Sequence, residues 1–225
     1  MLFNFSDFKL DKYNRVEIPT VILATPNKVL LGALGIFSHA PHFELKLNDI
    51  STVEFEIPAH YFDDDGERQS TPLYDSVVGK MLLKIDPIGF FRITNPVIIN
   101  EGLDERKVVK AFSLEDELND TTISAWEGTF PLFRPSSDAA DSVLGMITAL
   151  RPSWRVGRVS PAISGAWRTF QVTTKSLYEF IKDDLQKLYQ AVFTFDTYER
   201  TINVSTIEEL ASGSILSLSH DKFDQ

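Results

Sequence analysis

Cysteine is absent from this 225-residue chain. Disulfides, thiol nucleophiles and thiolate metal sites are therefore all excluded. Long apolar runs are lacking as well, because the longest, residues 29–37, is interrupted by Gly32 and Gly35. It falls well below the roughly 20 residues that a membrane-spanning helix needs. Residues 1–7 have neither a basic start nor a continuous apolar stretch, so no signal peptide is predicted, and the compartment stays open.

An excess of basic charge is also lacking. Asp and Glu number 32 against 22 Lys and Arg, which gives a net charge of −10. The densest local charge is acidic, at residues 63–67, and no basic cluster offsets it. Because an acidic surface repels phosphate backbones, we expect no specific nucleic-acid binding. Passage of DNA beside the protein without adsorption stays compatible with this charge.

What the chain does contain is enough apolar material to fold. Hydrophobic residues make up 43% of it and 17 residues are Phe, so the composition is that of a globular protein. The length allows one large domain or two small ones.

Alternating apolar and polar residues dominate the chain from Val16 to Leu114. Phe43, Leu45 and Leu47 alternate with charged residues, a pattern typical of strands with one solvated face. Between residues 59 and 73 this rhythm disappears, which predicts an exposed loop. The expected strands are 17–24, 28–31, 43–47, 53–57, 81–85, 89–93, 97–100 and 108–114.

The periodicity changes after Glu115. Ser136, Ser137 and Asp138 precede an apolar stripe that predicts a helix of about four turns ending at Arg151-Pro152. Ser176 and Glu179 fit a capping box at the start of a second helix. Short strands are expected at 155–159 and 169–173, and a hairpin is expected from residues 191–195 and 201–204 around the turn 196–200.

This order of elements predicts a β-rich α+β fold, with an antiparallel barrel or sandwich interrupted by a two-helix α/β insertion. The expected domains are a discontinuous β domain of residues 1–114 and 190–210, and an inserted subdomain of residues 115–189. Residues 211–225 are expected to begin a further domain, since residues 215–219 have the pattern of a first strand. We therefore expect the sequence to end inside a longer protein.

Candidate metal sites are few. His39 and His42 form a possible pair, but no third ligand is marked, and an ordinary loop with two exposed imidazoles is the alternative. His60 and His220 are isolated and expected at the surface or in turns. Residues 63–66 offer oxygens for calcium. However, the calcium-loop pattern would place its first ligand at Tyr61 and its twelfth at Pro72, which favours a solvated acidic turn.

Catalytic motifs of nucleophilic hydrolases, zinc peptidases and phosphate-binding loops do not occur in the sequence. We therefore predict no catalytic, cofactor-binding or metal-binding residues, no cofactor and no enzymatic activity. Gly32 and Gly35 are expected at a strand end or bulge. Trp126, Trp154 and Trp167 have two interpretations, packing between the insertion and its parent domain or stacking on sugars.

Four segments resemble the N-terminal hub region of siphophage and prophage tail-associated lysin (tail endopeptidase) proteins. They share the order and spacing of that family over most of the chain. The segments are residues 47–58 (LNDISTVEFEIP), 154–157 (WRVG), 167–170 (WRTF) and 192–197 (VFTFDT).

The resemblance implies a structural hub or baseplate component of the tail tip that links the tail tube to the distal adhesion and lysin apparatus. The β domain is then tube-like, and the full-length protein is a homotrimer that contacts the distal tail protein ring and the tape-measure protein. Its location is the virion tail tip, after synthesis in the bacterial cytoplasm. The alternatives are a carbohydrate- or receptor-binding module of the tail tip and a peptidoglycan hydrolase.

Overall fold

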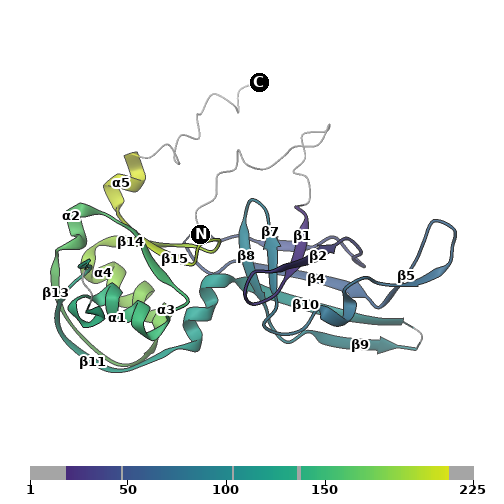
Figure 1. The fold of residues 1–225 in the computed structure, drawn as a ribbon, viewed down its shortest axis with the longest axis horizontal. Coiled ribbons are helices and arrows are strands. Elements are labelled where there is room, and N and C mark those ends of the chain that lie inside the picture. Colours follow the sequence, from purple (N-terminus) through teal and green to yellow (C-terminus); the bar gives the residue numbers. More distant parts are fainter. Residues whose placement is uncertain (1–18, 47, 103, 136–137, 213–225) are drawn as a thin grey trace. The chain divides into compact units, whose positions relative to one another are not determined.

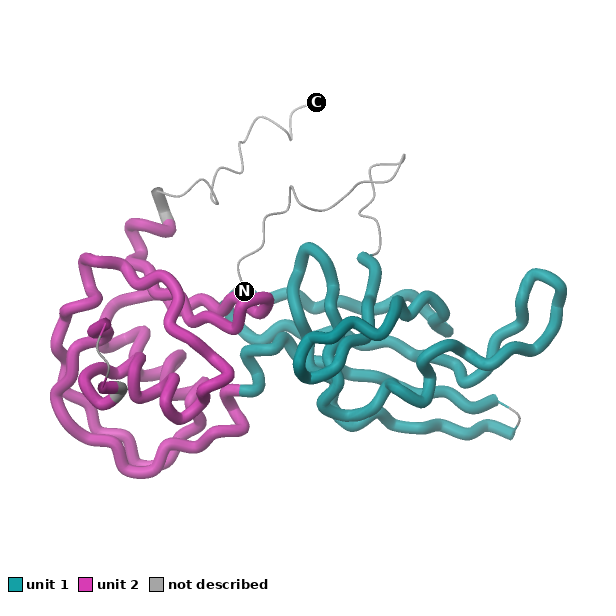
Figure 2. The backbone as a smooth tube through the Cα atoms, viewed as in Figure 1, with its two compact units in different colours: residues 1–117 teal, residues 118–225 magenta. Residues whose placement is uncertain are grey.

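The computed structural model describes residues 19–46, 48–102, 104–135 and 138–212. The chain divides into two compact units, residues 1–117 and 118–225 (Figure 2). Within the described residues, no helix is both long and apolar enough to cross a membrane.

Unit 1 is built on one antiparallel sheet (Figure 1). Its strand order is β2-β1-β7-β8-β10-β4-β3, and β9 pairs with the first half of β10. β2 and β3 are the first and last strands of this order. The strands are β1 (Val21–Ala24), β2 (Leu30–Leu34), β3 (His42–Glu44), β4 (Thr52–Pro58), β7 (Leu82–Ile85), β8 (Gly89–Ile93), β9 (Val97–Glu101) and β10 (Asp104–Ser113).

One face of this sheet forms the core of unit 1. In β4, Val53, Phe55 and Ile57 are buried while Glu54 is exposed, as the alternation predicts. Leu83 and Ile85 from β7 and Val109 and Ala111 from β10 join the same cluster. Because all these strands contribute one face to a single core, the hydrophobic effect fixes the register of the sheet.

The stretch predicted as a loop at residues 59–73 contains a hairpin. β5 (His60–Phe62) and β6 (Arg68–Ser70) pair antiparallel outside the main sheet, and a 3₁₀ turn, η2 (Tyr74–Ser76), follows. The prediction failed here because both faces of the hairpin are partly solvated: His60 and Phe62 are exposed and Tyr61 is half-buried. Apolar alternation marks a strand only when one of its faces is buried.

Unit 2 contains two smaller sheets and short helices. β11 pairs with β13, and β12, β15 and β14 form a three-stranded sheet in which β12 and β15 are parallel. The elements are η3 (Leu114–Asp120), which begins in unit 1, then β11 (Thr122–Pro131), η4 (Ala139–Asp141), α1 (Val143–Leu150), β12 (Arg155–Val159), α2 (Pro161–Ser164), β13 (Trp167–Ser176), α3 (Leu177–Glu179), η5 (Phe180–Leu185), α4 (Gln186–Tyr189), β14 (Ala191–Asp196), β15 (Thr201–Thr206) and α5 (Ile207–Ser212).

The hairpin of β14 and β15 was expected to return to the first domain, and the described ladders join it to β12. β15 pairs with β14 on one side and with β12 on the other, and the hairpin belongs to the compact unit of residues 118–225. The alternation in residues 191–204 identifies a hairpin but not the sheet that it joins, because its buried residues fit any apolar layer. Residues 213–225, including His220 and the expected strand 215–219, lie outside the described residues.

The second helix begins at the predicted capping box. The Ser176 hydroxyl accepts from the Glu179 amide, and the Glu179 carboxylate accepts from the Ser176 amide. Residues 180–185 then widen into a π-helical segment. The first helix is shorter than expected: α1 has eight residues, because Ser142 is extended and caps its start.

Strand β11 was not predicted. Its buried positions change phase between Ile123 and Trp126, and Ala125 between them has a φ of 55°. Gly128 has a φ of 144°, and a Cβ there would lie 2.5 Å from the Phe130 ring, so this site requires glycine. A strand with these irregularities loses the period of two on which sequence prediction depends.

Candidate functional site

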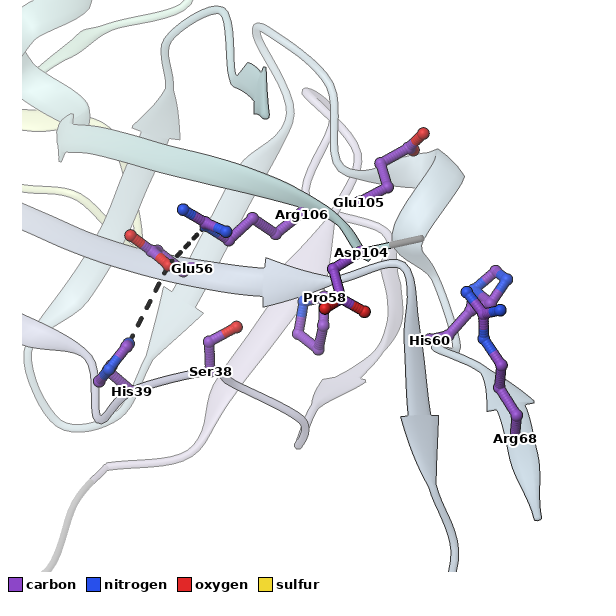
Figure 3. Close-up of a pocket in the computed structure, with 9 residues that line it drawn as sticks. All are labelled: Ser38, His39, Glu56, Pro58, His60, Arg68, Asp104, Glu105 and Arg106. Carbon is purple, nitrogen blue, oxygen red and sulfur yellow. Dashed lines mark ion pairs between the residues drawn. The ribbon is translucent and has the colours of Figure 1, made fainter. Parts of the chain in front are cut away.

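A charged hollow opens on unit 1 where β4, β5, β6 and β10 come together (Figure 3). Its volume is about 430 Å³ and it is broadly open to solvent. The lining residues are Ser38, His39, Glu56, Pro58, His60, Arg68, Asp104, Glu105 and Arg106. The hollow thus combines cationic, anionic and imidazole side chains from segments far apart in sequence.

Arg106 organises the charges of this hollow. Its Nη1 and Nη2 donate to the two carboxylate oxygens of Glu101 at 3.1 and 3.2 Å, and its Nε lies 3.2 Å from Glu56 Oε2. The hydrogen bonds from Arg106 lower the pKa of Glu101, and the same bonds raise that of Arg106. His39 Nδ1 is 4.0 Å from Glu56 Oε2. A dashed line marks this pair in Figure 3. A carboxylate held by a guanidinium in this way is a structural group rather than an evident acid or base.

Tyr74 and Lys107 are buried beneath the hollow, and Tyr74 is bonded to Glu105, which lines it. Tyr74 Oη donates to Glu105 Oε1 at 2.9 Å, and burial, with this contact, raises the tyrosine pKa. Lys107, only 6% exposed, donates to the carbonyls of Tyr74 at 2.7 Å and Val77 at 3.2 Å. Burial lowers the pKa of the lysine. These bonds fasten the segment around η2 to β10.

The predicted histidine pair is divided by the structure. His39 lines the hollow together with His60, whereas His42 is exposed on β3 and is not among the lining residues. Among the described residues, no group of three potential metal ligands comes together. Figure 3 places the two histidines at opposite ends of the hollow, and the contact of His39 is with Glu56 of β4, a residue that its spacing to His42 does not indicate.

The acidic turn after β5 uses Asp63 internally. Its Oδ1 accepts from the amides of Asp65 and Glu67 at 3.1 and 2.8 Å, and its Oδ2 accepts from the Gln69 side chain at 3.0 Å. The hydrogen bond from Gln69 is the main reason that the pKa of Asp63 is lowered. This carboxylate therefore closes the turn of the β5–β6 hairpin.

The three tryptophans have different environments. Trp154 is 1% exposed and lies edge-on to Phe195 at a centroid distance of 5.8 Å. Trp126 is half-buried and makes a similar contact with Phe180 at 5.8 Å. Trp167 is 53% exposed at the start of β13. Trp154 and Trp126 therefore pack against aromatic residues of unit 2 itself, and the stacking interpretation is open only for Trp167.

Aliphatic side chains are exposed at two strand edges of unit 1, a feature that sequence reasoning missed. Val97 and Ile98 on β9 are 60% and 54% exposed, and Leu30 on β2 is 50% exposed. β9 pairs only with β10, and β2 only with β1, among the described strands. Edge strands with exposed aliphatic residues are surfaces on which another chain can pack.

Two solved structures with a similar fold are prophage tail proteins. Prophage tail protein gp18 from Listeria monocytogenes EGD-e aligns with a TM-score of 0.54 and 15% identity, over 84% of this chain and 51% of that one. The 43 kDa tail protein of prophage MuSo2 from Shewanella oneidensis aligns with a TM-score of 0.55 and 11% identity, over 84% of this chain and 56% of that one.

The chain spans about half the length of these two proteins. No protein-family model and no curated protein matches its sequence. The predicted β-rich α+β fold is confirmed, and it is similar to that of the two prophage tail proteins.

Proposed function

We propose that this chain is a structural, non-enzymatic component of a bacteriophage tail. The observation that carries the proposal is the similarity in fold of 84% of the chain to two solved prophage tail proteins. At 15% and 11% identity this similarity concerns the fold, so the role in the tail is the inference that we add.

The surface of unit 1 supports a role in assembly. Its uncovered strand edges at β2 and β9 carry exposed aliphatic residues, and its hollow has paired charges. Such surfaces suit contacts with other subunits. A neighbouring subunit that packs on these edges would remove Leu30, Val97 and Ile98 from water. The function that follows is geometric: the unit holds neighbouring tail parts in position.

More specifically, we propose a hub or baseplate subunit at the tail tip that links the tail tube to the distal adhesion and lysin apparatus. The resemblance of residues 47–58, 154–157, 167–170 and 192–197 to the tail-associated lysin family supports this position. The proposed partners are two further copies in a homotrimer of the full-length protein, the distal tail protein ring and the tape-measure protein.

Electron microscopy of purified phage tails tests the position. Gold-labelled antibodies raised against this chain should bind at one end of the tail, and negative-stain images of the full-length product should show a three-fold ring with a central hole. Label distributed along the tail, or absent from it, would contradict the tail-tip assignment. Zymography on bacterial cell walls separates the hydrolase alternative, since a clear band from the purified chain would contradict a purely structural role.

The net charge of −10 suggests a further part of the proposal. An acidic channel lining would let DNA pass without adsorbing, because like charges suppress contact with phosphate groups. A trimer structure in which basic residues line the channel would overturn this part and leave the structural role intact.

A further inference from the structure

The ribbon of β11 and β13 in unit 2 has two chemically different faces. Figure 1 shows the ribbon curving around the helices of this unit. The inner face packs against η5: Trp126 and Phe170 lie 5.8 and 5.4 Å from the Phe180 ring, measured between centroids. The side chains that alternate with these residues must project from the other face of the ribbon.

Cross-strand pairing arranges this outer face as a row. Glu127 is opposite Gln171, Thr129 is opposite Thr169, and Pro131 is opposite Trp167. Directly paired residues of antiparallel strands lie on the same face, and so do residues two apart along one strand. Trp167, Thr169 and Gln171 therefore lie in line, over roughly 13 Å at about 3.3 Å per residue.

The row is exposed and its polar groups are held in place. Thr129 Oγ1 and Thr169 Oγ1 are 2.7 Å apart, and Gln171 Nε2 donates to Glu127 Oε2 at 3.3 Å. Glu127, Thr129, Thr169 and Gln171 are all exposed to solvent. Each side chain keeps further hydrogen-bonding capacity, because hydroxyl, amide and carboxylate groups each have more than one bonding position.

Trp167 provides an aromatic surface at one end of the row. More than half of the residue, 53%, is exposed, and the Arg134 guanidinium lies 5.9 Å from its ring centroid. This cation–π contact favours a defined orientation of the indole. The exposed indole offers an apolar surface to the C–H groups of a ligand. The neighbouring threonine hydroxyls offer hydrogen bonds to the ligand's own hydroxyl groups.

A hollow of about 370 Å³ adjoins the row. Residues 169–172 of β13 line it together with Asp183, Asp184, Lys187 and Leu188, so it lies between β13 and the segment of η5 and α4. Lys175 Nζ donates to Asp184 Oδ2 at 2.7 Å, which fastens β13 to η5 along this hollow. The hollow therefore lies along β13 next to the row, and it shares Thr169 and Gln171 with the row.

We infer that the outer face of the β11–β13 ribbon binds an oligosaccharide, with one sugar ring stacked on Trp167 and neighbouring hydroxyl groups bonded to Thr129, Thr169 and Gln171. Sugars present both an apolar C–H face and many hydroxyl groups, and this row offers a partner for each. Carboxylates of Glu127 and Asp183 disfavour a polyanionic ligand by charge repulsion. This activity goes beyond the structural role proposed above and does not depend on it.

Glycan-array binding of the purified full chain tests the inference, with neutral oligosaccharides, chitohexaose among them, as probes. We expect binding that Trp167→Ala weakens by roughly tenfold or more and that Trp167→Phe largely retains. Thr169→Val should weaken it severalfold. Phe62→Ala is the matched control, because it removes an aromatic residue that is 73% exposed on unit 1 and should leave binding unchanged.

Absence of binding to every neutral probe, or equal binding by the wild-type chain and Trp167→Ala, would overturn the inference. Incorporation of the same variants into tails is measured in parallel. A Trp167→Ala chain that binds sugars normally but fails to enter tails would show that this face is a protein contact. Lost sugar binding with normal incorporation would support the inference and leave the structural proposal unaffected.

Discussion

Lys107 and Tyr74 make a buried contact in which a cation is held without a carboxylate in direct contact. Lys107 Nζ donates to the Tyr74 carbonyl oxygen at 2.7 Å and lies 4.3 Å from the centroid of the same residue's ring. A buried ammonium group is costly unless its donors are satisfied, and here two carbonyl groups and an aromatic face satisfy them. The contact joins β10 to the segment around η2, which adjoins the charged hollow.

Replacement of Lys107 by Ala should therefore destabilise unit 1. The change leaves the buried carbonyls of Tyr74 and Val77 without this donor, at a cost of about 1–3 kcal/mol. Urea unfolding followed by far-UV circular dichroism measures the loss in free energy of unfolding. Lys110→Ala is the control, because Lys110 is 48% exposed and its ion pair with Glu54 should contribute no more than about 1 kcal/mol. Equal effects of the two substitutions would contradict the role assigned to Lys107.

Ser176→Ala should destabilise unit 2 by about 1 kcal/mol. The substitution removes the acceptor for the Glu179 amide at 3.1 Å and the bond to Asn119 Oδ1 at 2.8 Å. Thermal unfolding of the full chain would show the change. Ser124→Ala, at an exposed position of β11, provides a serine control that should have little effect. An unchanged midpoint in Ser176→Ala would show that the cap contributes nothing.

Tyr189 should make the protein sensitive to alkaline pH. Burial raises its pKa from 10.0 to about 12, so the folded state keeps the proton after the unfolded chain has lost it. The stabilisation is complete below pH 10 and is lost as the pH rises toward 12. Stability measured across this range should fall less steeply in Tyr189→Phe. That variant should also lose roughly 1 kcal/mol at neutral pH, because Tyr189 Oη donates to the Phe130 carbonyl at 3.0 Å.

Replacement by Ala should destabilise the protein far more at Trp154 than at Trp167. Trp154 is 1% exposed, and its loss opens a cavity that costs about 3–5 kcal/mol. Trp167 is 53% exposed, and its loss should change stability by less than about 1 kcal/mol. Calorimetry of the two variants distinguishes them. A large loss of stability in Trp167→Ala would mean that its indole is a packing group.

Ile98→Lys should impair incorporation of the protein into tails without unfolding it. Ile98 is 54% exposed on the β9 edge, so a lysine is tolerated by the free chain but would be buried in an assembled interface. Leu150→Lys, at an aliphatic residue that is 42% exposed on α1, is the matched control. Quantitative immunoblotting of purified tails measures both variants. Wild-type levels of the Ile98→Lys chain in tails would exclude this edge from the assembly surface.

Local chemistry made part of the structure predictable. The alternation of Val53, Phe55 and Ile57 with acidic residues identified β4, and Ser176 with Glu179 identified the start of the second helix. Both patterns involve residues only a few positions apart, so the physical interaction that they report is local. The hairpin of β5 and β6 and strand β11 escaped prediction, because solvated faces and positive φ angles removed the period of two.

The sequence by itself determined the strand-rich composition of the fold, the positions of most strands and the capped second helix, because side-chain periodicity and capping act within a few residues. Only the tertiary structure decided which strands pair and which side chains meet. Thr129 meets Thr169 across two strands, and Arg106 forms ion pairs with both Glu56 and Glu101. The hairpin of β14 and β15 pairs with β12. These relationships depend on strand register and on packing between distant segments, which are set by the burial of a whole core rather than by any local pattern.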